Sequence, residues 1–104
     1  MEFVETAWFT ARITALLDDD AYGELQAELI CRPKAGTVIP GTGGLRKLRW
    51  RAPDRGKRGG LRVIYYYCSG DLLYLIFVYD KTTQENLTGR QMRLICESIK
   101  GELT

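Results

Sequence analysis

Three segments indicate the fold most clearly: LRKLRW at residues 45–50, LRVIYYYC at 61–68 and LLYLIFVY at 72–79. From Lys47 to Arg51, basic and apolar residues alternate with the period of two that is typical of a β-strand. The second and third segments are rich in aromatic and β-branched residues and are joined by a tight turn at 69–71. The third segment is almost continuously apolar, which predicts a strand covered on both faces. We therefore expect an antiparallel meander.

The sequence before the meander predicts one short strand and two helices. Glu2–Glu5 is a candidate first strand, and Thr6 can cap a helix over residues 7–17 because its hydroxyl accepts a free N–H. The aspartates at 18–20 predict the N-terminal cap of a second helix that runs to about Cys31, since carboxylates oppose the helix dipole.

The remaining segments complete a single α+β domain over residues 1–104. Residues 33–44 are rich in Gly and Pro but lack the phosphate-loop pattern, so we expect a plain connection. Thr88 and Gln91 form a capping box before a last helix. Its apolar stripe is Met92, Ile95, Cys96 and Ile99. The predicted order is β-α-α-β-β-β-α, a two-layer fold with helices packed on an antiparallel sheet.

The formal charge is strongly segregated along the chain. The total is only +2. Residues 1–30 carry a net charge of −6, residues 31–62 carry +9 and residues 63–104 carry −1. A basic block of this kind indicates a surface that binds a polyanion.

Composition excludes several kinds of chemistry. The chain has no histidine, so a histidine-based triad, an imidazole base and a histidine-ligated metal are all excluded. The cysteines Cys31, Cys68 and Cys96 are odd in number and lack metal-ligand spacing, so we expect three buried, reduced side chains. No apolar run is long enough to span a membrane, and the N-terminus does not resemble a secretory signal. We expect a cytoplasmic protein without metal or cofactor.

One group of residues on the meander carries the functional hypothesis. Alternation places Lys47, Arg49 and Arg51 on one strand face, and neighbouring strands can add further side chains. Those additions are Arg62, Tyr79 and Lys81. Guanidinium groups bind phosphate in bidentate fashion and an aromatic ring can stack on a base, so this patch suits RNA. A charged strand face can also be plain solvated surface.

The same patch can support RNA cleavage without histidine. RNA supplies its own nucleophile, the 2′-hydroxyl. The ammonium form of a lysine among other cations is disfavoured, so such a lysine can act as a base. Arginines remain charged and can stabilise the transition state. Arg62 is expected to be exposed at the surface, so that its removal would not unfold the protein.

Residues 41–81 resemble a known family. The segments GTGGLRKLRW and GKRGGLRVIYY, the strand end LIFVYDK and the predicted element order are similar to the RelE/HigB superfamily of bacterial toxins, and most similar to HigB-type toxins of type II toxin–antitoxin systems. The resemblance covers roughly residues 3–100. It implies a ribosome-dependent, metal-independent endoribonuclease that cuts mRNA in the ribosomal A site. It also implies a HigA-like helix-turn-helix antitoxin, through which alone operator DNA would be bound.

The resemblance also assigns roles to residues of this chain. Its basic positions fall on Lys47, Arg49, Arg62 and Lys81, with Lys47 or Lys81 as the base and Arg62 at the transition state. Arg49 would contact the leaving group or the phosphate. Tyr79 is added to the catalytic set because the C-terminal segment offers no tyrosine or histidine. Phosphate contacts are assigned to five further bases of the block, Arg46, Arg51, Arg55, Lys57 and Arg58.

Two alternatives remain open at this point. A ParE-like toxin would poison DNA gyrase and would not need a cation at Lys81. An RNA-binding module without chemistry would tolerate the loss of any single base, with affinity falling uniformly.

Overall fold

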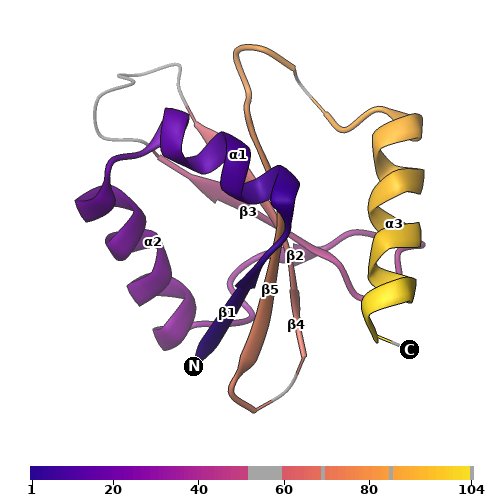
Figure 1. The fold of residues 1–104 in the computed structure, drawn as a ribbon, viewed down its shortest axis with the longest axis horizontal. Helices are drawn as coiled ribbons and strands as arrows, with labels where there is room; N and C mark the ends of the chain where they lie inside the picture. Colours follow the sequence, from indigo (N-terminus) through magenta and orange to yellow (C-terminus); the bar gives the residue numbers. More distant parts are fainter. Residues whose placement is uncertain (52–59, 69, 85, 104) are drawn as a thin grey trace.

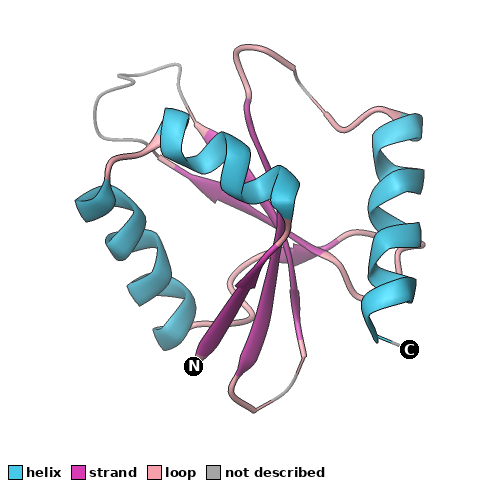
Figure 2. Ribbon diagram, in the orientation of Figure 1, coloured by secondary structure: helices cyan, strands magenta, loops and turns pink. Residues whose placement is uncertain are grey.

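In the computed structural model, residues 1–51, 60–68, 70–84 and 86–103 are described, with residues 98–103 described by their helical backbone only. The elements are β1 (Glu2–Glu5), α1 (Ala7–Leu16), α2 (Asp19–Cys31), β2 (Thr37–Val38), β3 (Arg46–Trp50), β4 (Leu61–Tyr67), β5 (Leu72–Asp80) and α3 (Gly89–Leu103). They form a small α+β domain (Figures 1 and 2). No helix within the described ranges combines the length and apolar character of a membrane span.

The sheet has five strands in the order β1-β5-β4-β3-β2. The predicted meander is confirmed, because β4 pairs antiparallel with both β3 and β5. The expectation of a wholly antiparallel sheet is wrong, since β1 pairs parallel with β5 along Glu2–Glu5. A four-residue strand contains no pattern that distinguishes the two directions, so only the packed structure could decide this point.

The connection over residues 33–44 contains a strand that the sequence did not indicate. Thr37 and Val38 pair antiparallel with Lys47 and Arg46, so β2 and β3 form a hairpin at one edge of the sheet. The turn includes Gly41 at φ +77°, a conformation that side chains other than glycine rarely adopt.

The predicted helix caps are confirmed. The Thr6 hydroxyl and the Asp18 carboxylate each accept the backbone N–H three residues on, at 3.1 and 2.8 Å. Thr88 and Gln91 form a reciprocal capping box, in which each side chain accepts the other residue's backbone N–H at 3.0 Å. These bonds satisfy N–H groups that have no partner inside their helices.

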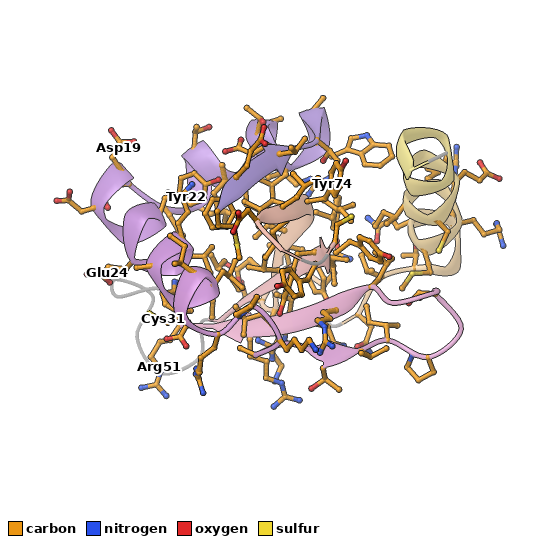
Figure 3. All side chains as sticks on the ribbon, turned by 90° about the horizontal axis from the view of Figure 1, so that it is seen from below. Asp19, Tyr22, Glu24, Cys31, Arg51 and Tyr74 are labelled. Carbon is orange, nitrogen blue, oxygen red and sulfur yellow. The ribbon has the colours of Figure 1, made fainter. Side chains whose placement is uncertain are left out.

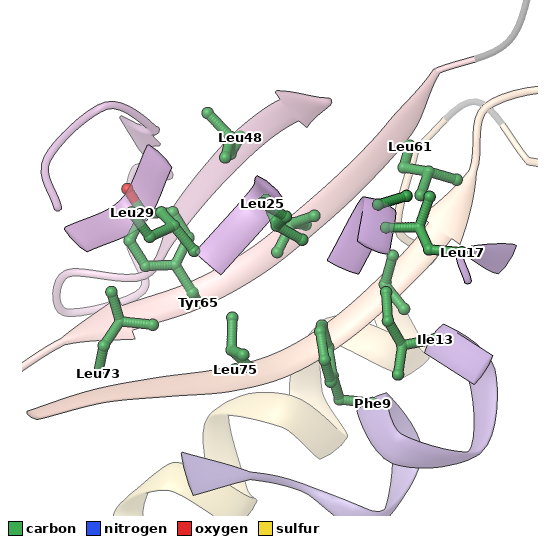
Figure 4. Packing of buried hydrophobic residues seen from close by; sticks show 13 residues of the cluster. Phe9, Ile13, Leu17, Leu25, Leu29, Leu48, Leu61, Tyr65, Leu73 and Leu75 are labelled. Carbon is green, nitrogen blue, oxygen red and sulfur yellow. The ribbon is translucent and has the colours of Figure 1, made fainter. Parts of the chain in front are cut away.

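Helices cover both faces of the sheet, so the expectation of two layers is wrong. One core cluster joins α1 and α2 to the sheet, and Figure 4 shows Phe9, Leu25 and Leu29 of this cluster together with Leu75 on β5. A second cluster on the opposite face includes Ile95 from α3. Since β4 and β5 are apolar on both sides, burying only one face would leave a large apolar surface in water.

A β-bulge interrupts the pairing of β4 with β5. Ile64 pairs with Phe77, but the next residue, Tyr65, pairs with Leu75, so Ile76 is the extra residue. Ile76 and Phe77 both belong to the cluster beneath α3. The bulge therefore changes which residues of β5 face each side.

The cysteines are free, but the prediction that all three are buried is wrong. Cys31 is exposed at the end of α2, and Cys68 and Cys96 are half-buried. Cys96 packs at the margin of the cluster beneath α3, as the predicted stripe requires.

Two glycines with open surroundings, Gly23 and Gly41, test whether the backbone is helical at the first and left-handed at the second. Beyond its immediate chain neighbours and, for Gly23, its own helical backbone, a methyl group at Gly23 in α2 or at Gly41 would meet no atom within 4 Å, but only Gly41 has a positive φ. Gly23→Ala should raise the unfolding free energy by up to about 1 kcal/mol, because alanine is the better helix former. Gly41→Ala should lower it by about 1–2 kcal/mol because of the left-handed backbone. Urea unfolding measures both, and equal effects would contradict the assignment.

Candidate nucleic-acid interface

Three side chains of the predicted site form a row across the sheet. The register pairs Arg49 on β3 with Arg62 on β4, and Arg62 with Tyr79 on β5. Directly paired residues in antiparallel strands lie on the same face. Two guanidinium groups and one phenol are therefore brought together on the face that α3 partly covers.

Lys47 belongs to the neighbouring row on the same face. It pairs with Ile64, which in turn pairs with Phe77. Lys47 and Tyr79 both line a cavity of about 190 Å³. The other lining residues are Ile39, Asn86, Leu87 and Met92. The cavity thus joins a cation and a phenol to an amide and apolar walls.

The sequence did not single out Asn86 and Leu87 as site residues. They belong to the connection between β5 and α3, and nothing in that segment predicts that it lies beside Lys47. Only the packing of α3 against the sheet brings this connection to the cationic face.

Arg62 is buried, so the expectation of an exposed side chain is wrong. Its exposed fraction is 8%, because β4 is the middle strand and α3 packs over the same face. The guanidinium Nη1 donates to its neighbour's backbone oxygen, Leu61 O, at 3.4 Å. A buried cation directly opposite the cation of Arg49 is electrostatically costly. An anion bound between the two would relieve that cost.

Tyr79 is almost fully enclosed, with an exposed fraction of 1%. Its hydroxyl is buried and has no hydrogen-bond partner among the described residues. Burial raises the pKa of the Tyr79 phenol, while the charge of Arg62 opposes part of the increase. Tyr79 is therefore a neutral hydrogen-bond donor at physiological pH rather than a base.

Lys81 and Arg51 lie at the margin of the row. Lys81 follows the last residue of β5, is exposed, and its backbone N–H donates to Gly60 O at 3.0 Å. Arg51 follows β3 and extends away from the ribbon (Figure 3). Lys81 and Arg51 are both accessible to a large partner. The acidic residues Asp19 and Glu24 lie on a different element, α2.

Arg46 does not share the face of the other cations. It pairs with Tyr65, whose side chain belongs to the cluster beneath α1 and α2. Its guanidinium donates to Gly36 O at 2.8 Å, so it also braces the connection before β2. The other predicted phosphate contacts, Arg55, Lys57 and Arg58, lie outside the described residues.

No protein-family model matches the chain. Within the described ranges, no group of three or more cysteine or acidic side chains is placed to hold a metal ion. Among the described residues, the candidate site contains cations, the Tyr79 phenol and the adjoining cavity.

A pair of tyrosine variants tests the burial of the Tyr79 hydroxyl. Tyr79→Phe should raise the unfolding free energy by up to about 1 kcal/mol, because an unpartnered hydroxyl is removed. Tyr65→Phe should lower it by about 1–3 kcal/mol. The reason is that the Tyr65 hydroxyl accepts from Gly36 N and donates to Pro33 O, both at 2.8 Å. Urea unfolding at neutral pH measures both.

The same variant gives a pH test. The pKa of Tyr79 is raised above 10.0, its ordinary value, so the folded state holds the proton more tightly than the unfolded state. Stability from this group is complete below pH 10 and is lost as the pH rises above it. Tyr79→Phe should therefore weaken the fall of unfolding free energy above pH 10, and an unchanged fall would contradict the assignment.

Anion binding tests the facing guanidinium groups. Millimolar sulfate should raise the Tm by about 2–5 °C over chloride at equal ionic strength, since an anion that binds the folded state stabilises it. Arg49→Gln should remove most of that increase. Arg32→Gln is the matched control, because the Arg32 guanidinium is already paired with Glu28 at 2.6 Å. An equal loss in both variants would point to a general salt effect.

Proposed function

We propose that this protein is a toxin of the RelE/HigB type that cleaves mRNA on the ribosome. The observation that supports the proposal best is the row Arg49–Arg62–Tyr79 with Lys47 beside it. A metal-independent RNA cleavage site without histidine needs cations and a proton donor around one phosphate. The sequence resemblance indicates mRNA as the substrate, and the basic block accounts for the affinity for this polyanion.

The proposed reaction uses the 2′-hydroxyl of the RNA. Lys47 or Lys81 removes the proton of that hydroxyl, and the oxygen attacks the adjacent phosphorus. The bond from phosphorus to the 5′-oxygen breaks, and the leaving 5′-oxygen takes up the proton that the lysine has accepted. Arg62 and Arg49 stabilise the additional negative charge on the phosphorane. Tyr79 donates a hydrogen bond to a phosphate oxygen.

The ribosome would orient the substrate for this site. Cations alone give weak catalysis, and holding the mRNA with its 2′-oxygen in line with the scissile bond supplies a large part of the rate. The resemblance further implies a cognate helix-turn-helix antitoxin and action in the cytoplasm. The antitoxin and the cytoplasmic location are both part of the proposal.

A variant of Arg62 that preserves the fold tests the proposal. Arg62→Met keeps an unbranched stem in the buried position, and exchanging a buried charge for an apolar group is often neutral for stability. We expect a Tm close to that of the wild type and a loss of cleavage of at least about 100-fold. The assay is primer extension on mRNA bound to programmed ribosomes. Arg32→Gln should cleave as the wild type does.

The chemistry of the products tests the nucleophile. The wild type should leave a 2′,3′-cyclic phosphate and a 5′-hydroxyl, and a 2′-deoxy nucleotide at the cut should block the reaction. Growth arrest with intact mRNA and induction of a DNA-damage response would instead indicate a gyrase poison. RNA binding that declines uniformly with each lost cation, without cleavage, would indicate a binding module.

A further inference from the structure

Gly60 lies beside the guanidinium of Arg62. It is buried immediately before β4, and its φ is outside the left-handed range, so the backbone does not require glycine there. A Cβ atom at this position would lie 3.0 Å from Arg62 Nη1 and 3.9 Å from Trp50 O. Glycine is therefore used for the space that it leaves, and that space adjoins the Arg62 guanidinium.

The backbone of Gly60 also contacts the other side of the site. Its carbonyl oxygen accepts the backbone N–H of Lys81 at 3.0 Å, which fixes the first residue after β5. One residue thus lies against the charged end of Arg62 and holds the backbone of Lys81. Both are cations of the proposed cleavage site.

We propose that Gly60 is a positioning residue, which keeps the guanidinium of Arg62 aligned with Arg49 and Tyr79. A contact of 3.0 Å is too close, so a methyl group at residue 60 would force one of the two groups to move. The nearest atom is the far end of a flexible side chain, whereas the backbone oxygen lies at ordinary contact distance. The guanidinium therefore moves, and the strand stays in place.

The functional consequence rests on the proposed function, but the displacement does not. An error of about 1 Å in the placement of a catalytic group can cost about 100-fold in rate. The shift caused by one methyl group is smaller than that, so we expect Gly60→Ala to lose about tenfold in cleavage. Anion binding should also weaken, since the two guanidinium groups would no longer face one site.

A double-mutant cycle tests this proposal. The variants are Gly60→Ala, Arg62→Met and the combination of both, and sulfate is the probe. Gly23→Ala is the control, because a methyl group at Gly23 meets no atom within 4 Å beyond its chain neighbours and its own helical backbone. Gly60→Ala should fold as the wild type does, while the increase in Tm caused by sulfate should fall by at least half. In the Arg62→Met background the same change should have no further effect on that increase.

The outcomes separate the two proposals. A full response to sulfate in Gly60→Ala, or an equal loss in both backgrounds, would overturn the positioning role. Gly60→Ala could fail to fold, and the double variant then decides. If the double variant folds, the added methyl group clashes with Arg62, as proposed. If the double variant also fails to fold, the clash lies elsewhere and the positioning role is overturned. If sulfate raises the Tm of the wild type and Gly60→Ala reduces that increase, but the wild type leaves RNA intact, the proposed nuclease function is overturned and the positioning role of Gly60 is not.

Discussion

The structure depends on the position of β4, which is hydrogen-bonded to a strand on each side and packed on both faces. No side chain on β4 from Leu61 to Tyr65 reaches solvent freely. This enclosure gives the hydrophobic stabilisation of the domain, and it also encloses Arg62. The same constraint that holds the sheet together therefore places a cation where its charge is poorly hydrated and its interaction with an anion is strong.

The bulge at Ile76 connects the fold with the candidate site. Strict alternation along β5 would place Tyr79 on the same face as Leu73 and Leu75, which pack beneath α1 and α2. The extra residue reverses the alternation, so Tyr79 lies beside Arg62 and beneath α3. Bulges are common next to functional sites because they redirect a side chain without ending the sheet.

Burial separates the roles within the row. Arg49, on the outer part of the sheet, is exposed and can meet a phosphate directly, whereas Arg62 is enclosed and held in place by its surroundings. Gly60 belongs to that enclosure, because its missing side chain adjoins the guanidinium. An accessible cation beside a fixed one is suited to binding a polyanion first and aligning one of its phosphates afterwards.

Local sequence patterns were sufficient to predict most of the helices and strands. Alternation over β3 and the capping box at Thr88 and Gln91 depend on neighbours along the chain, so the sequence alone determined the strand, the helix start and the shared face of Lys47 and Arg49. The direction of β1, the covering of both sheet faces and the burial of Arg62 depend on contacts between distant segments. Tertiary structure decided those features, because the bulge, the packing of α3 and the space beside Gly60 exist only once the strands are paired.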